Sequence, residues 1–194
     1  MRTFLPEDLS IKNWAQIETY FEDLNTRAID SVEDLKKWMQ DRSELEAVLE
    51  ENMAWRYIKM NIDTTDPELQ KSFQFFVQTI SPNIAPYAHG FNTKLMNSKH
   101  LNDLDSACYF IYLRDIKNAI DIYREENIPL FTELTNKAQK FGEISAQMMV
   151  HIDGNEQTLQ QASIHLKSID RDKRKTVFEL INARRTEDQT SLDV

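Results

Sequence analysis

Apolar side chains recur every three or four residues along most of the chain, which is the spacing that puts them on one face of an α-helix. The first such stretch predicts a helix from about Asn13 to Ile29. Ser31 and Asp34 then resemble a capping box, in which a serine oxygen accepts from a free backbone N–H of the first turn. This signal predicts a second helix that begins there and extends to about Asn61. Its apolar stripe consists of Leu35, Met39, Leu45, Leu49 and Met53.

A third helix is predicted to begin at Asp66 and Pro67, because proline at the first helical position loses no hydrogen bond and an acidic residue complements the helix dipole. The long uncharged stretch that follows contains Pro82 and Pro86. Each proline lacks the donor that the helix ladder needs and disfavours a helical residue before it. We therefore expect a kink or break here, followed by a short helix to about Asn97, so that the stretch forms an interior or partner-facing helix pair.

Two more helices follow a polar loop over residues 97–105. The clearest helical stripe in the chain is formed by Tyr109, Leu113, Ile116, Ile120 and Tyr123. Asn127 and Pro129 then restart the pattern, which continues across Gly142. Its apolar positions are Phe131, Leu134, Ala138, Phe141 and Met148.

The period changes to two near residue 148, where Val150 and Ile152 alternate with a polar residue ahead of the dipeptide Asp153-Gly154. Alternation followed by Asp-Gly is typical of a β-hairpin with a tight turn. Residues 158–166 read as helical again, and Asp170 opens a last helix. The predicted fold is mainly α: a multi-helix bundle of long antiparallel helices with one small β-hairpin near residues 148–159.

Composition narrows the classes of function. The 194 residues carry a net charge of −9, which disfavours nucleic acid and anionic membranes as partners. The chain has only three glycines, so a glycine-rich phosphate loop is excluded. A single cysteine rules out an intrachain disulfide, and the amino end does not read as a secretory signal. These features favour a cytoplasmic protein without a membrane partner.

No catalytic or metal-ligating residue is predicted within the chain. The four histidines, His89, His100, His151 and His165, belong to no H-E-x-x-H motif and are expected to be ordinary core or surface side chains. Cys108 lacks a neighbouring base, so a buried core cysteine is the favoured interpretation over a nucleophile. Substrate-binding residues are not identified by the sequence.

Three further groups have a structural and a functional interpretation, and the structural one is favoured in each. The carboxylates Glu44, Glu46, Glu50 and Glu51 are expected on a solvated helix face. A basic concentration could bind an anion but is interleaved with acids, which favours an ion-paired face. It consists of Arg171, Lys173, Arg174, Lys175, Arg184 and Arg185. An aromatic stripe could line a peptide channel, although core packing is the favoured role. It consists of Phe73, Phe75, Phe76, Tyr87 and Phe91.

An ordered series of short segments resembles the N-terminal region of oligoendopeptidase F-like zinc metallopeptidases, relatives of thimet oligopeptidase. The series covers nearly the whole chain, and its strength lies in the order of its members. It comprises Arg2-Thr3-Phe4-Leu5-Pro6, Asp41-Arg42-Ser43-Glu44-Leu45, Ala54-Trp55-Arg56-Tyr57, Asp63-Thr64-Thr65-Asp66, Glu126-Asn127-Ile128-Pro129-Leu130, Asp153-Gly154, Thr158-Leu159-Gln160-Gln161 and Asp170-Arg171.

The resemblance implies an N-terminal, non-catalytic part of an enzyme that hydrolyses short peptides, with a helical shell enclosing a substrate channel. The family binds zinc through H-E-x-x-H and a later glutamate. This chain matches none of those positions, so zinc is expected in the full-length parent and no cofactor in this chain. The implied partners are an oligopeptide substrate and a missing C-terminal catalytic domain.

The resulting organisation is one N-terminal helical lobe over residues 1–194. Long helices are expected over 1–146, a hairpin over 147–159, and the start of the helices that lead into the catalytic domain over 160–194. No cap or stop signal follows the last helix, which favours a chain that continues in its parent. The alternative is a free-standing helical protein-interaction or dimerisation module with no enzymatic activity.

Overall fold

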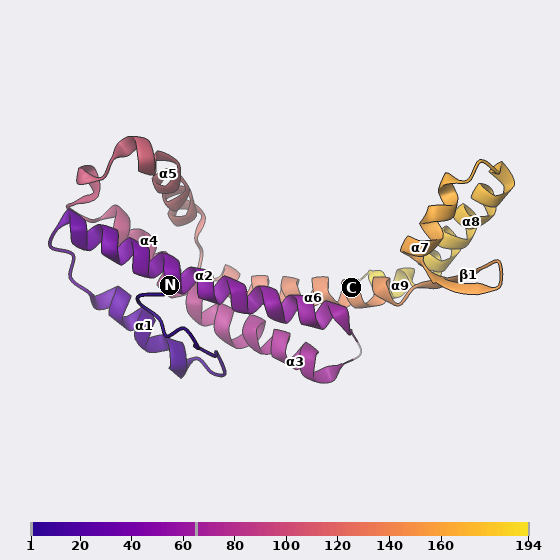
Figure 1. Cartoon of the computed structure of the whole chain (residues 1–194), viewed down its shortest axis with the longest axis horizontal. Coiled ribbons are helices and arrows are strands. Elements are labelled where there is room, and N and C mark those ends of the chain that lie inside the picture. The colour runs from indigo at the N-terminus through magenta and orange to yellow at the C-terminus, as the bar shows by residue number, and fades with distance from the viewer. Residues whose placement is uncertain (1, 65, 194) are drawn as a thin grey trace. The chain divides into compact units, whose positions relative to one another are not determined.

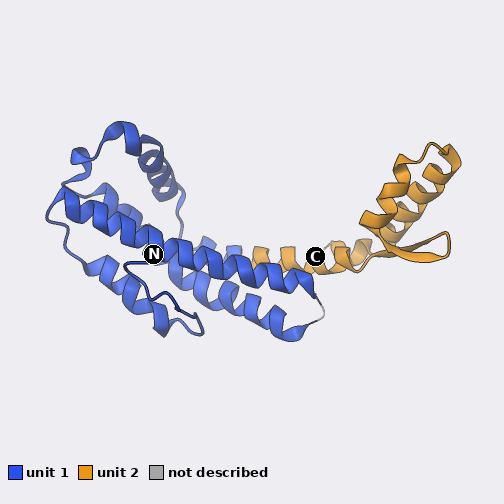
Figure 2. Ribbon diagram, viewed as in Figure 1, with its two compact units in different colours: residues 1–132 blue, residues 133–194 orange. Residues whose placement is uncertain are grey.

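The computed structural model describes residues 2–64 and 66–193, which divide into two compact units over 1–132 and 133–194 (Figures 1 and 2). The described chain is mainly α-helical with one two-stranded antiparallel sheet, as predicted. Its α-helices and strands are α1 (Ala15–Thr26), α2 (Val32–Ile62), α3 (Pro67–Phe75), α4 (Ser81–Met96), α5 (Ser106–Ile122), α6 (Asn127–Ala146), β1 (Met149–Ile152), β2 (Asn155–Thr158), α7 (Leu159–Ser163), α8 (Arg171–Glu187) and α9 (Gln189–Leu192). A π-helical turn, η1 (Phe76–Ile80), and two 3₁₀ segments, η2 (Leu101–Asp103) and η3 (Ile164–Lys167), connect them.

Three helices begin at side-chain caps on the residues that the sequence signals predict, and a fourth begins at a cap that was not predicted. Ser31 Oγ accepts from the backbone N–H of Asp34 at 3.1 Å at the start of α2. Asp66 caps α3 and Asp170 caps α8 in the same way. Thr158 forms a complete capping box at the start of α7. Each cap satisfies backbone donors that a helix leaves free in its first turn, so these helix starts depend on local chemistry alone.

The largest element of unit 1 is an antiparallel helical hairpin formed by α2 and the α3–α4 stretch (Figure 1). Arg56, near the turn, donates from Nη1 to the carbonyl oxygen of Ser72 at 2.9 Å. Arg42, farther back along α2, donates from Nη2 to Oδ1 of Asn92 at 2.7 Å. An earlier residue of α2 therefore contacts a later residue of the α3–α4 stretch, which is the arrangement of an antiparallel pair.

The core of unit 1 lies where α1 packs against this hairpin. Trp38 is fully buried, donates from Nε1 to the carbonyl oxygen of Leu24 at 2.7 Å, and meets Phe91 edge-on. Of the stripe predicted on α2, Leu35, Leu45 and Leu49 are buried, and the two methionines pack against the core in part. The predicted stripe of α5 contributes Ile116 as its buried member.

Of the kink or break predicted at the prolines, the break is wrong. Helical structure runs without interruption from α3 through η1 and α4, and Pro86 lies inside α4. The irregularity takes the form of a π turn, in which the N–H of Ser81 donates to the carbonyl of Phe76 five residues earlier. Pro82 then occupies the first turn of α4, where a missing N–H costs little. Among the described residues, no helix combines the length and hydrophobicity that crossing a membrane requires.

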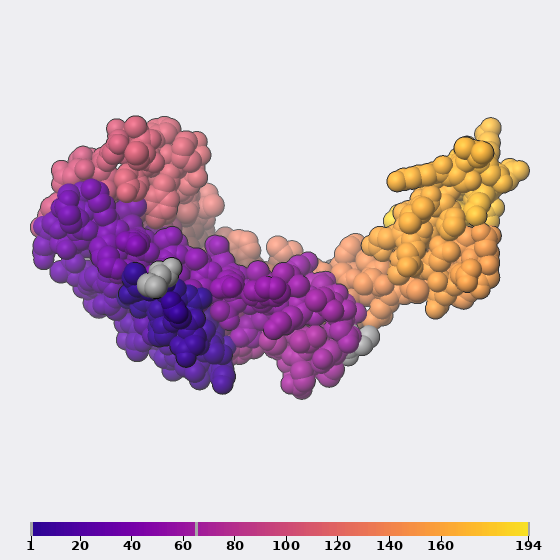
Figure 3. All heavy atoms as spheres, in the orientation of Figure 1, coloured from indigo at the N-terminus to yellow at the C-terminus, as the bar shows by residue number. Residues whose placement is uncertain are grey.

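The amino-terminal segment is held against α2, where indigo and purple atoms meet in Figure 3. Glu44 accepts three backbone N–H bonds with its carboxylate: from Thr3 at 2.9 Å, Phe4 at 2.9 Å and Leu5 at 2.7 Å. Partial burial alone would raise the pKa of Glu44, but these backbone donors outweigh it, and the pKa lies below its ordinary value. Glu44 therefore has a structural role that its expected place on a solvated face did not anticipate.

Unit 2 has a small core of its own, in which the hairpin packs against α7 and α8. Val150 and Ile152 of β1 meet Ala162, Val177 and Ile181. The predicted hairpin is present, and its strands pair from Met149 opposite Thr158 to Ile152 opposite Asn155. Asp153 and Gly154 have φ angles of 52° and 79°, so both turn residues lie in the left-handed region that a type I′ hairpin turn requires.

The helix α6, within which the boundary between the two units falls, has no fully buried residue among those described. Its predicted stripe is largely exposed, with Phe131 63%, Leu134 62% and Phe141 53% accessible. The helix was therefore predicted correctly, but of its predicted stripe only Met148 is buried among the described residues.

Candidate functional site

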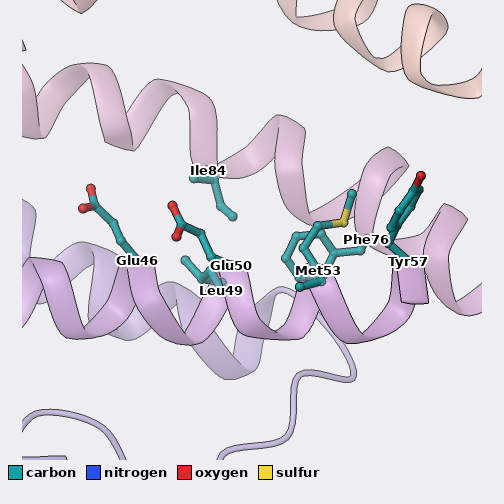
Figure 4. Close-up of a pocket in the computed structure, with 8 residues that line it drawn as sticks. Glu46, Leu49, Glu50, Met53, Tyr57, Phe76 and Ile84 are labelled. Carbon is teal, nitrogen blue, oxygen red and sulfur yellow. The ribbon is translucent and has the colours of Figure 1, made fainter. Parts of the chain in front are cut away.

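An open groove of about 580 Å³ lies in unit 1 along the face of α2 that meets η1 and α4 (Figure 4). Helix α2 supplies most of its lining and the facing helices supply two residues. The lining residues are Glu46, Leu49, Glu50, Met53, Ala54, Tyr57, Phe76 and Ile84. Ile84 points from α4 toward Leu49 and Glu50, and Phe76 lies beside Met53 (Figure 4). Phe76 opens the π turn, so the irregular part of the helix forms one wall of the groove.

The groove is acidic at one end and apolar at the other. Glu46 and Glu50 leave α2 on the same side, one helical turn apart (Figure 4). Toward the other end the lining consists of Met53, Phe76 and Tyr57. The ring centroid of Tyr57 lies 5.9 Å from that of Phe73. Such a surface can bind an extended apolar chain and a cation. Its lining residues do not include a nucleophile with a neighbouring general base.

A buried arginine lies beneath the acidic end. Arg42 is 5% exposed, and its Nε donates to Glu46 at 2.7 Å while Nη2 donates to Asn92 at 2.7 Å. Its guanidinium also lies over the rings of Trp38 and Phe91. Within the described residues, Nη1 of Arg42 is buried without a hydrogen-bond partner. Because the arginine is hardly solvated, its charge is balanced chiefly by Glu46.

Arg56 fixes the other flank of α2. Besides the bond to Ser72, its Nη2 donates to the carbonyl oxygen of Ile11 at 2.8 Å, and its guanidinium lies over Phe75 and Phe76. The pKa of Arg56 is lowered because burial penalises its charged form. Arg56 thus joins the amino-terminal segment, α2 and the wall of the groove.

A second cavity, of about 320 Å³, lies between α4, α5 and the start of α6. His89 stacks on Tyr123 there, with ring centroids 4.0 Å apart, and its Nδ1 is buried without a partner among the described residues. In unit 2, a third cavity of about 430 Å³ is lined by residues that include Phe141, Met148 and Arg185. Neither brings together a nucleophile and a base.

The histidines do not converge. His100 Nδ1 lies 3.1 Å from Asp103, and His165 Nε2 lies 3.1 Å from Gln157, both as local contacts. Across residues 2–64 and 66–193, no three His, Cys, Asp or Glu side chains are grouped so that they could hold a metal ion. The described residues therefore do not fit the zinc that the family resemblance implies.

The prediction that Cys108 is a core residue is wrong. The side chain is exposed near the start of α5, and its Sγ donates to the Asp105 carboxylate at 3.2 Å. This hydrogen bond, with the charge of Asp105, raises the pKa of the thiol. Asp105 is the N-cap of α5, and residues 105–108 are all exposed at this end of the helix. A raised pKa is unfavourable for a nucleophilic cysteine.

The structural interpretations of the basic concentration and of the aromatic stripe agree with the contacts that the structure shows. In the basic concentration of α8, Lys173 pairs with Asp153, Lys175 with Glu179 and Arg184 with Asp188. In the aromatic stripe, Phe73, Phe76 and Phe91 are buried, while Phe75 and Tyr87 pack partly against the core.

Sequence reasoning did not identify the groove. Glu50 and Glu51 are exposed and the Glu46 side chain is 44% accessible, so the solvated face expected for these three is confirmed, but Arg42 and Asn92 were not singled out. A helical pair of acids one turn apart is common on surfaces, so the only available signal was a basic residue four positions before Glu46. Whether that face looks onto water or onto another helix depends on how α4 packs.

The chain resembles known peptidases in sequence and fold. The family model described as "Peptidase M3 N-terminal domain" matches residues 4–123. No curated protein matches the chain. A solved putative oligoendopeptidase F from Bacillus anthracis str. Ames superposes with a TM-score of 0.84 at 19% identity, over 100% of this chain and 36% of its own.

Two further structures agree. A second putative oligoendopeptidase F has a TM-score of 0.85 at 20% identity, over 98% of this chain and 33% of its own. PZ peptidase A with inhibitor 2 has a TM-score of 0.84 at 18% identity, over 97% of this chain and 33% of its own. The chain spans about a third of the length of the solved structures it matches, and likeness at these identities shows the shared fold. The family match over residues 4–123 shows that the chain belongs to the peptidase M3 family and contains its N-terminal domain.

Proposed function

We propose that this chain is the N-terminal, non-catalytic portion of a zinc-dependent oligoendopeptidase that hydrolyses short peptides in the cytoplasm. The observation that carries the proposal is the match of residues 4–123 to the N-terminal domain of peptidase M3. The zinc and its ligands would lie in a C-terminal catalytic domain outside this chain. Residues 160–194 would begin the helices that lead into that domain.

In this proposal, the chain contributes a wall of the substrate channel and excludes bulky substrates. Support comes from an open apolar groove and from apolar side chains of α6 that are more than half exposed, among them Leu130, Leu134 and Phe141. Apolar surface of this kind is typical of an interface with another part of a protein or with a ligand. The catalytic domain is the partner that we assign to α6.

The proposal is tested first on the encoding gene and then on the protein. Reading the gene onward from the codon for Val194 should give an H-E-x-x-H motif, and its absence would contradict the assignment to an active oligoendopeptidase. The purified chain should contain no stoichiometric zinc by elemental analysis and should not cleave an internally quenched oligopeptide. Zinc-dependent cleavage by the chain alone would overturn its non-catalytic role.

The second candidate is a free-standing helical interaction or dimerisation module. The exposed stripe of α6 favours it, because an amphipathic helix can pair with a partner through such a face. A stop codon after Val194, together with a stable dimer by light scattering, would support this candidate over the first.

A further inference from the structure

The groove along α2 has the length of a short peptide. Its lining on α2 runs from Glu46 to Tyr57. At a rise of 1.5 Å per residue, this part of the helix is about 16 Å long. An extended peptide advances about 3.3 Å per residue, so about five residues fit along the whole lining, and about three fit along the roughly 10 Å between Glu50 and Tyr57.

The groove carries one uncompensated negative charge. Glu46 is bound by Nε of the buried Arg42 at 2.7 Å, so this pair is close to neutral. Glu50 makes no ion pair or hydrogen bond with any residue that the structure describes. Glu50 is exposed and borders the apolar side chains of Leu49, Met53 and Ile84, so a cation placed against it would form a surface ion pair beside an apolar surface.

The position of this charge indicates which cation fits. Both acids lie at one end of the groove, and the lining beyond Glu50 is apolar as far as Tyr57 (Figure 4). A lysine in the middle of a peptide would require room for the chain on both sides of the charge. A terminal ammonium requires room for the peptide chain on one side only. The apolar lining between Glu50 and Tyr57 provides that room.

We propose that the groove binds the amino-terminal segment of an oligopeptide, with the α-ammonium against Glu50 and apolar side chains along Met53, Phe76 and Tyr57. This inference rests on the proposed function, since it names the end of the substrate that this wall receives. A second copy of the chain is a poorer occupant, because it would bring a net charge of −9 toward an unpaired carboxylate.

The test compares two pentapeptides of Leu and Phe that carry a fluorophore at the carboxyl end, one with a free amino end and one acetylated. Fluorescence anisotropy with the 194-residue chain should show binding of both, with acetylation weakening it by about fivefold, the ratio expected for one exposed ion pair. Glu50→Gln should weaken binding of the free peptide by the same factor and leave the acetylated one unchanged. Ala54→Arg, which fills the groove from an exposed position, should abolish binding of both.

The matched control is Glu51→Gln, which removes the same charge from the next position of α2, where the exposed Glu51 lies 3.5 Å from the half-buried Arg2. This variant should bind both peptides as the unaltered chain does. Equal affinity for the two peptides, no effect of Glu50→Gln, an equal effect of Glu51→Gln, or no binding of either peptide would overturn the inference.

Failure of the inference can be told from failure of the proposed function. If the gene encodes H-E-x-x-H and the full-length enzyme cleaves free and acetylated peptides with equal kcat/KM, regardless of Glu50→Gln, the enzyme assignment stands and the groove assignment falls. If the pentapeptides bind as expected but no H-E-x-x-H follows Val194, the groove binds peptide ends in a protein that is not an active peptidase.

Discussion

Replacing Glu44 by Gln should loosen the amino-terminal segment and destabilise unit 1. One carboxylate oxygen accepts from Phe4 at 2.9 Å and Leu5 at 2.7 Å, and the other accepts from Thr3 at 2.9 Å. A glutamine keeps one oxygen for the first two donors, without their charge assistance, and turns an NH₂ group toward the N–H of Thr3. Hydrogen bonds to charged groups contribute about 1.5–3 kcal/mol each, and partial exposure reduces this, so we expect a net loss of about 1–2 kcal/mol.

The three tryptophans, Trp14, Trp38 and Trp55, all lie in unit 1, so tryptophan fluorescence during urea unfolding reports this unit selectively. Glu44→Gln should lower the midpoint without changing the slope. Glu50→Gln on the same helix has no partner to lose among the described residues and should stay within about 0.5 kcal/mol of the unaltered chain.

The same variant gives a pH test. Since the folded pKa of Glu44 is lowered, its contribution is fully present above the unfolded pKa of about 4.3 and is lost as the pH falls through the folded value. The stability difference between the unaltered chain and Glu44→Gln should therefore be constant above about pH 5.5 and shrink toward pH 3. Equal midpoints at pH 7, or a difference that persists unchanged at pH 3, would refute the role assigned to this carboxylate.

Three further changes test other parts of the structure. Gly154→Ala should lower the stability of the hairpin by about 1 kcal/mol, because φ is 79° there; a clash adds nothing, since no neighbour lies within 4 Å of a new Cβ. Amide hydrogen exchange in β1 and β2 should become faster, and unchanged exchange would contradict the assigned turn. Cys108 should react completely with a thiol reagent in the native chain, and faster in Asp105→Asn, where the hydrogen bond that raises the thiol pKa is weakened; a thiol protected until unfolding would contradict its exposure. Lys94→Met should lower the free energy of unfolding by about 1–3 kcal/mol in the fluorescence assay, because Nζ donates to three carbonyl oxygens at the end of α1 at 2.7–2.8 Å. An unchanged urea midpoint would show that water replaces these hydrogen bonds.

The elements that the sequence predicted well are those whose causes are local. Ser31 and Asp66 start their helices with their own side chains, and Asp153-Gly154 turns the hairpin because these residues tolerate positive φ. The chain does not break at Pro82, because here packing against distant residues outweighs the local signal. A proline removes one donor, but the packing of Ile80 and Phe91 into the core holds the chain helical on both sides.

The amino-acid sequence by itself determined the helical class, the element order, the hairpin and the family resemblance, because periodicity, caps and turn residues act over a few positions. Only the tertiary structure decided that Glu44 clamps the amino-terminal segment, that Arg42 neutralises Glu46, and that Glu50 is left as an unpaired charge in an apolar groove. It also decided that Cys108 faces solvent. Whether a helix face meets water or another helix depends on contacts between residues tens of positions apart, which no local pattern encodes.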